Sequence, residues 1–106
     1  MTILRIKKIE ESDNFITFKE IYTQIECQVE RSKFVNAMKN LYYWRRETFP
    51  SSFSDMLYQL LNKADDENKM KIFKGFPEAT ICYLLWYTNK EKSETTFFCT
   101  WLLNEV

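Results

Sequence analysis

The sequence of 106 residues contains no histidine and only one glycine. Histidine is the usual general base near neutral pH, so its absence excludes a Ser-His-Asp or Cys-His catalytic site. A single glycine is too few for the glycine-rich loops that hold phosphates and dinucleotides. The acidic residues 65–67 are adjacent, and on a helix start their side chains diverge, unlike those of a calcium loop. We therefore expect no enzyme, no cofactor and no metal site.

The three cysteines, Cys27, Cys82 and Cys99, are odd in number and far apart. This usage argues against a disulfide framework and favours a reducing compartment. Because Cys82 and Cys99 lie in apolar segments, we expect both to be inert core residues. The N-terminus lacks the apolar run of a signal peptide, which predicts a cytoplasmic protein. Fifteen basic and fifteen acidic residues cancel, so net charge provides no general attraction to nucleic acids or to membranes.

The shortage of glycine and proline also bears on the fold, because a β-sandwich needs turn residues about every 8–12 positions. The length predicts a single domain, residues 1–106. Residues 78–88 are apolar on every side of a helical wheel, as is typical of a helix buried inside a domain. Pro77 suits the first turn of that helix. We expect a mostly α, compact single domain of five or six short helices around the buried helix 78–88.

Three further segments carry helix signals. Ser32 can cap a helix that ends near residue 47, Ser51 or Ser52 can cap the next, and Asp65 can cap a short one that ends before Gly75. The middle helix has an apolar stripe of Phe53, Met56, Leu57, Leu60, Leu61 and Ala64.

Residues 18–30 carry two conflicting patterns. Thr17 and Glu20 have the spacing of a capping box, and Ile16 and Ile21 have that of a hydrophobic staple, which together favour a helix. The alternation of apolar residues from Ile21 to Val29 is instead typical of an edge strand. We favour the helix.

Both ends of the chain are ambiguous as well. Residues 3–9 have the β-branched composition of a short strand, or form an extended arm. Ser93 and Glu94 resemble a helix start, whereas residues 95–101 are strand formers by propensity. We favour a helix over residues 94–104. The alternative is an α+β protein with strands near 3–9 and 95–103.

The run from Tyr42 to Arg46 is the main candidate binding site. Tyrosine, tryptophan and arginine dominate binding hot spots because they combine large area with a polar group. The predicted partner-binding residues are Tyr43, Trp44, Arg45, Arg46 and Tyr58. On a helical wheel Tyr43 points away from the apolar face, while Tyr58 and Lys63 lie off the stripe of the next helix and extend the patch. The alternative is that Trp44 packs against Phe49 and the arginines are merely solvated.

A segment of the chain resembles small accessory proteins of bacteriophages and prophages. The resemblance covers residues 49–87. It consists of Phe49-Pro50-x-x-Phe53-x-x-x-Leu57-x-x-Leu60, then Lys63-Ala64-Asp65-x-x-Asn68, then Gly75-Phe76-Pro77-Glu78. Small non-enzymatic phage proteins often bind a host protein, and one recurring role is to block a defence system such as a CRISPR nuclease. The resemblance brings no functional residues with it.

Three functions follow from these observations. The first is a non-catalytic protein-binding module, an accessory protein of a phage or mobile element. It inhibits a host protein such as a CRISPR nuclease or its ribonucleoprotein in the bacterial cytoplasm. The second is a module that binds nucleic acid or a ribonucleoprotein through the residues 43–46. The third is a structural homodimer joined through aromatic surface. We favour the first.

Overall fold

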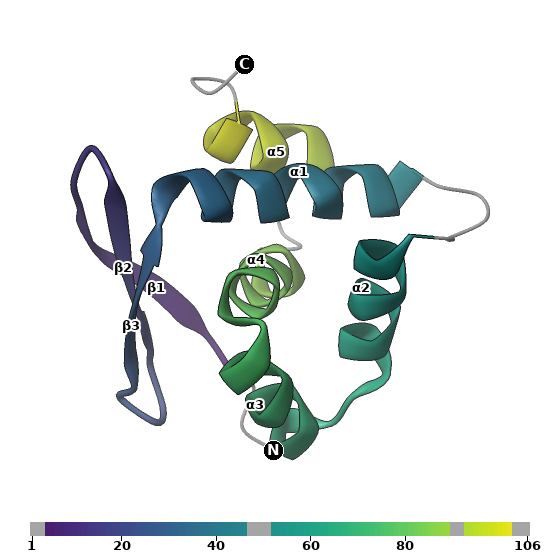
Figure 1. Ribbon diagram of the computed structural model, residues 1–106, viewed down its shortest axis with the longest axis horizontal. Coiled ribbons are helices and arrows are strands. Elements are labelled where there is room, and N and C mark those ends of the chain that lie inside the picture. Colours follow the sequence, from purple (N-terminus) through teal and green to yellow (C-terminus); the bar gives the residue numbers. More distant parts are fainter. Residues whose placement is uncertain (1–3, 47–51, 90–92, 103–106) are drawn as a thin grey trace.

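The computed structural model describes residues 4–46, 52–89 and 93–102 (Figure 1). In chain order the elements are β1 (Ile6–Glu11), β2 (Phe15–Glu20), β3 (Glu26–Glu30), α1 (Arg31–Arg46), α2 (Phe53–Lys63), α3 (Asp66–Gly75), α4 (Pro77–Thr88) and α5 (Glu94–Leu102). The strands form an antiparallel sheet in the order β1-β2-β3. The protein is therefore α+β, and the prediction of a mostly α fold was wrong.

The main error lies at residues 18–30, which form most of the β2–β3 hairpin rather than a helix. Its register places Ile16 opposite Val29 and Phe18 opposite Cys27. Ile16, Phe18 and Val29 are all buried, as the two-residue period of a strand with one covered face requires. The alternation expected from Ile21 onward is only partly realised, because residues 21–25 form the turn and Ile21 and Ile25 are exposed. The covered face of the two strands outweighed the local capping signal, because burial of a whole face stabilises more than one cap does.

The two ambiguous segments near the chain ends adopt different structures, a strand near the N-terminus and a helix over residues 94–102. Strand β1 pairs with β2 and is interrupted by a bulge near Ile9, so the strand expected near residues 3–9 exists but begins later. Residues 94–102 form helix α5, and no strand lies over the described part of 95–103. The Ser93 hydroxyl accepts a hydrogen bond from the backbone N–H of Thr96 at 3.1 Å, which caps the first turn.

Helix α4 is the centre of the domain, and the prediction of a buried helix there is confirmed. Every side chain from Ala79 to Trp86 is buried. Figure 1 shows α4 nearly end-on, with the sheet, α1, α2 and α3 arranged around it. Helix α5 packs on the far side of α1, so α1 is covered by a helix on two sides.

Helix α2 begins and ends as expected, but the side that it turns toward the core differs from the predicted apolar stripe. Ser52 and Asp55 form a reciprocal capping box, and Asp65 caps α3 through the N–H of Asn68. The core side of α2 carries Tyr58 and Leu61. Three members of the predicted stripe, Phe53, Met56 and Leu60, are instead exposed.

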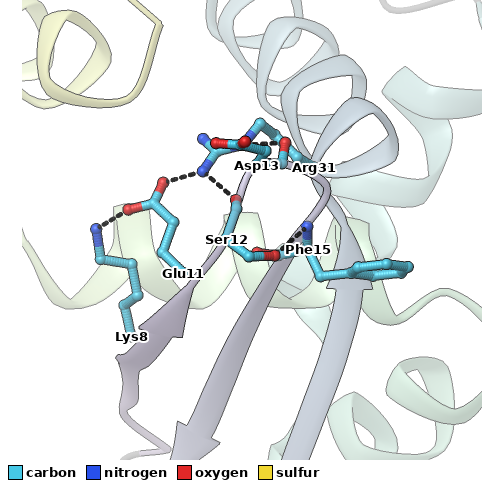
Figure 2. Close-up of polar contacts among 6 residues, drawn as sticks. All are labelled: Lys8, Glu11, Ser12, Asp13, Phe15 and Arg31. Atoms are coloured by element: carbon cyan, nitrogen blue, oxygen red, sulfur yellow. Dashed lines mark hydrogen bonds and ion pairs between the residues drawn. The ribbon is translucent and has the colours of Figure 1, made fainter.

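Arg31 fastens the β1–β2 turn to the start of α1 (Figure 2). Its guanidinium donates to a carboxylate oxygen of Glu11 at 2.6 Å and to the carbonyls of Ser12 and Asp13 at 2.8 and 3.1 Å. Lys8 bonds the other oxygen of Glu11 at 2.8 Å. Hydrogen bonds from Lys8 and Arg31 lower the pKa of the Glu11 carboxyl. The network therefore joins the sheet to the helical part of the domain.

The β2–β3 turn is held by the buried carboxylate of Glu20. One oxygen accepts from the backbone N–H of Tyr22 and Thr23 at 2.9 and 2.7 Å, and the other accepts from Arg5 N–H at 2.7 Å. Gln24 follows with a positive φ of 62°. A single side chain thus fixes the turn and ties it to the residue before β1.

We predict that Glu20→Ala lowers the free energy of unfolding by about 2–3 kcal/mol, because three backbone donors lose their acceptor. Urea unfolding measures the change. Glu26→Ala, at an exposed position of β3, is the control and should stay within about 0.5 kcal/mol of wild type. Equal effects of the two substitutions would contradict the role given to Glu20.

Candidate functional site

The predicted binding run at the end of α1 is divided between two environments. Successive helical residues are about 100° apart, so a run of five neighbours cannot share one face. Tyr43 and Arg46 line a groove between α1 and α5. Trp44 and Arg45 contact Trp86 of α4, and Trp44 also contacts Tyr58 of α2. The structure therefore brings only part of the predicted patch to one surface.

The groove between α1 and α5 has a volume of about 530 Å³. Eight residues line it: Lys39, Tyr42, Tyr43, Arg46, Thr95, Phe98, Cys99 and Leu102. Phe98 and Leu102 are buried and form its floor, whereas Tyr43 is 58% exposed at its rim. We call this surface the α1–α5 groove.

Aromatic contacts hold the groove in shape. The Arg46 guanidinium lies 3.7 Å from the centre of the Tyr42 ring and 5.7 Å from that of Phe98. Tyr42 meets Phe98 and Tyr43 edge to face, with ring centres 5.1 and 5.7 Å apart. Such pairs each contribute about 0.5–1.5 kcal/mol beyond area burial. The cation and its neighbouring rings are therefore positioned before any partner arrives.

The charged residues that the structure describes in the lining of the α1–α5 groove have one sign. Among the described residues these are Lys39 and Arg46, and both are basic. Arginine and lysine donate several hydrogen bonds to carboxylates or phosphates, while the rings of Tyr43 and Phe98 offer apolar contact. The arrangement can bind an aromatic or aliphatic group that has an anionic group next to it.

Trp44 and Tyr58 belong to the interior rather than to the groove. Their rings are stacked with centres 5.8 Å apart, and Trp44 meets Trp86 edge to face at 6.0 Å. Tyr58 is 1% exposed, and its hydroxyl donates to the carbonyl of Ala37 at 2.7 Å. Tyr58 was expected on the surface because it lies off the predicted apolar stripe of α2. Within that stripe, however, Phe53, Met56 and Leu60 are exposed and Leu61 is buried.

Arg45 connects three helices. Its Nε donates to Glu94 of α5 at 2.7 Å, and its guanidinium lies 4.6 Å from the ring of Trp86 in α4. The indole N–H of Trp86 donates to the same Glu94 oxygen at 3.3 Å. Arg45 thus has partners within the fold.

Lys63 is exposed on α2 but does not line the α1–α5 groove, and Phe49 lies outside the described residues.

Half of the groove comes from α5, which the sequence did not identify as part of a site. Thr95, Phe98, Cys99 and Leu102 follow one another at spacings of three, one and three residues, as one face of a helix does. Cys82 is buried as expected, but Cys99 is exposed and not in the core. The helix was predicted, and its period was the available signal for which residues share one face, but that face was not considered as part of a site.

Within residues 4–46, 52–89 and 93–102, no group of three or more cysteine or acidic residues is placed to hold a metal ion. None of the helices in these ranges is long and apolar enough to cross a membrane. No model of a protein family, no curated protein and no solved structure matches the chain.

We predict that Trp44→Ala lowers the free energy of unfolding by about 2–3 kcal/mol, because it leaves a gap beside Tyr58 and Trp86. Tyr43→Ala, one residue away on the exposed side, loses its edge-to-face contact with Tyr42 and should lower it by no more than about 1 kcal/mol. Urea unfolding of both variants tests whether Trp44 packs within the fold while Tyr43 lies on its surface. A Tyr43→Ala variant as unstable as Trp44→Ala would refute it.

The buried phenols predict a loss of stability in alkali. Burial raises the pKa of Tyr83 to about 12, whereas an unfolded tyrosine ionises near pH 10. Folding therefore favours the protonated form, and the stabilisation is complete below pH 10. Between roughly pH 10 and 12 it falls by about 1.4 kcal/mol per pH unit for this group.

The matching variant is Tyr83→Phe, which cannot ionise and which also loses the bond from the Tyr83 hydroxyl to Asn62. It should be less stable than wild type at pH 7 by about 1 kcal/mol. Its stability should fall less steeply above pH 10, as measured by urea unfolding across the pH range. Parallel curves for the two proteins would show that Tyr83 does not cause the alkaline loss.

Proposed function

We propose that the protein is a non-catalytic protein-binding module and that the α1–α5 groove receives its partner. The observation that carries this proposal is the combination, at one groove, of the exposed Tyr43 ring with the fixed Arg46 cation. Aromatic residues and arginine are enriched at protein interfaces, where a pocket with rigid anchors loses little entropy on binding. The partner presents an apolar side chain beside a carboxylate.

The resemblance of residues 49–87 to small phage and prophage proteins supports a more specific partner. We propose a host protein, with a CRISPR nuclease or its ribonucleoprotein as the first candidate, bound in the bacterial cytoplasm. The module would inhibit by occupying a surface that the nuclease needs. An acidic, apolar segment of that host protein is the chemistry that the α1–α5 groove accepts.

A nucleic-acid partner is the second candidate, because an exposed tyrosine between two cations also suits an unpaired base and its phosphate. Tyr43, Lys39 and Arg46 would make those contacts. The balanced net charge supports the protein partner instead, since nucleic-acid binders usually have a basic excess.

We predict that Tyr43→Ala weakens partner binding by at least about tenfold, because a hot-spot aromatic is lost. The matched control is Tyr22→Ala: Tyr22 is 55% exposed, close to the 58% of Tyr43, but lies at the β2–β3 turn. Tagged wild type and both variants are used to capture proteins from a bacterium that carries CRISPR complexes. Wild type should capture one host protein in stoichiometric amount. Tyr43→Ala should fail to capture this protein, and Tyr22→Ala should still capture it.

The captured complex then separates the proposals. Addition of the wild-type protein to a purified CRISPR nuclease with its guide should stop cleavage at stoichiometric amounts, and Tyr43→Ala should not. Continued cleavage would reject the nuclease as the partner. Binding only to oligonucleotides, with affinity falling steeply as salt increases, would replace the protein partner by nucleic acid. Equal capture of the partner by Tyr43→Ala and Tyr22→Ala would show that it binds outside the α1–α5 groove.

A further inference from the structure

An exposed apolar surface runs along α2, on the side away from the core. It consists of Phe53, Met56 and Leu60 together with Phe76 from the α3–α4 junction, and we call it the α2 stripe. These four side chains are between 42% and 69% exposed. The rings of Phe53 and Phe76 lie with centres 5.6 Å apart. Spacings of three and four residues place the members from α2 in one line along the helix.

The fold itself does not require this surface. Helix α2 is attached to the domain through its opposite side, where Tyr58 and Leu61 are buried. Four large apolar side chains gathered on one face therefore remain in contact with water. Contiguous apolar surface of this kind marks an interaction site in soluble proteins.

We propose that the α2 stripe is the interface of a homodimer, in which two copies of α2 pack antiparallel about a twofold axis near Met56. In this arrangement Phe53 of each copy lies opposite Leu60 of the other, and the two Met56 side chains meet. The stripe contains no charged residue, so two identical surfaces meet without repulsion. A twofold contact needs a self-complementary surface, which this stripe supplies.

The area agrees with that of a dimer. Four half-exposed side chains of this size offer on the order of 400 Å² of surface. A standard interface buries roughly 800 Å² per partner, of which about two thirds is apolar in homodimers. The α2 stripe thus provides most of the apolar centre, and the polar residues beside it provide the rim.

Charge at the two ends of the stripe is complementary in the antiparallel orientation. Lys63 lies one turn beyond Leu60. Glu78 lies at the other end, where it lines a groove of about 200 Å³ with Ser54 and Phe76. Among the described residues, neither Lys63 nor Glu78 is in an ion pair. Antiparallel packing brings Lys63 of each copy toward Glu78 of the other, forming two equivalent pairs.

The test is the association state of the full chain, measured by sedimentation equilibrium from low to high micromolar concentration. Wild type should form a dimer. Met56→Glu should raise its dissociation constant by about 100-fold or more, because two like charges meet at the axis. Tyr22→Glu, at a similarly exposed aromatic elsewhere, should leave it unchanged. Leu60→Lys provides a second variant on the stripe, and circular dichroism checks that each variant is folded.

Charge reversal tests the orientation. Lys63→Glu alone should raise the dissociation constant by about fivefold, and adding Glu78→Lys should restore it. A chain that stays monomeric at every concentration would overturn the homodimer, including the case where another protein is found on the stripe. A dimer that is unaffected by both Met56→Glu and Leu60→Lys would also overturn it, because the contact would then lie on another face. These outcomes do not depend on Tyr43, so they are independent of the proposed function.

Discussion

The structure depends on one requirement, which is that α4 must be covered on every side. A helix that is apolar all round has no face to turn toward water. The sheet, α1, α2 and α3 surround it, and each therefore needs one apolar face of its own. For the sheet this face is Ile16, Phe18 and Val29, and for α1 it includes Phe34, Met38 and Leu41. The hairpin is thus a wall of the core rather than an addition to a helical bundle.

This requirement explains which elements the sequence could predict. The buried helix, the caps at Ser52 and Asp65 and the helix over residues 94–102 follow from local patterns, and the structure contains them. Residues 18–30 carry patterns for two structures at once, and the choice depends on which face the rest of the protein covers. The same holds for α2, where apolar residues occur on both sides. The positions of α1 and α4 determine that Tyr58 points inward, where it contacts Trp44 and Ala37, and that Met56 points outward.

The predicted binding residues at the end of α1 also show that local sequence patterns do not determine which face of a helix is covered. Composition drew attention to residues 42–46, but a list of residue types does not state which of them already have partners within the fold. Arg45 is bonded to Glu94 and Trp44 is stacked on Tyr58, contacts that join distant parts of the chain. Tyr42, Tyr43 and Arg46 are the members that line the α1–α5 groove, beside residues of α5 that are about 50 positions away in sequence.

The hydrogen bonds of the Glu20 carboxylate affect which positions of the β2–β3 turn tolerate substitution during evolution. One oxygen of this carboxylate accepts hydrogen bonds from the backbone N–H groups of Tyr22 and Thr23, so the shape of the turn does not depend on the side chain of Tyr22, whereas the Thr23 hydroxyl accepts a bond from the Ile25 N–H at 3.4 Å. Substitutions of Tyr22 can alter what the tip of the hairpin displays while the path of the backbone is kept. The turn is therefore a place where new specificity can arise at little cost to folding.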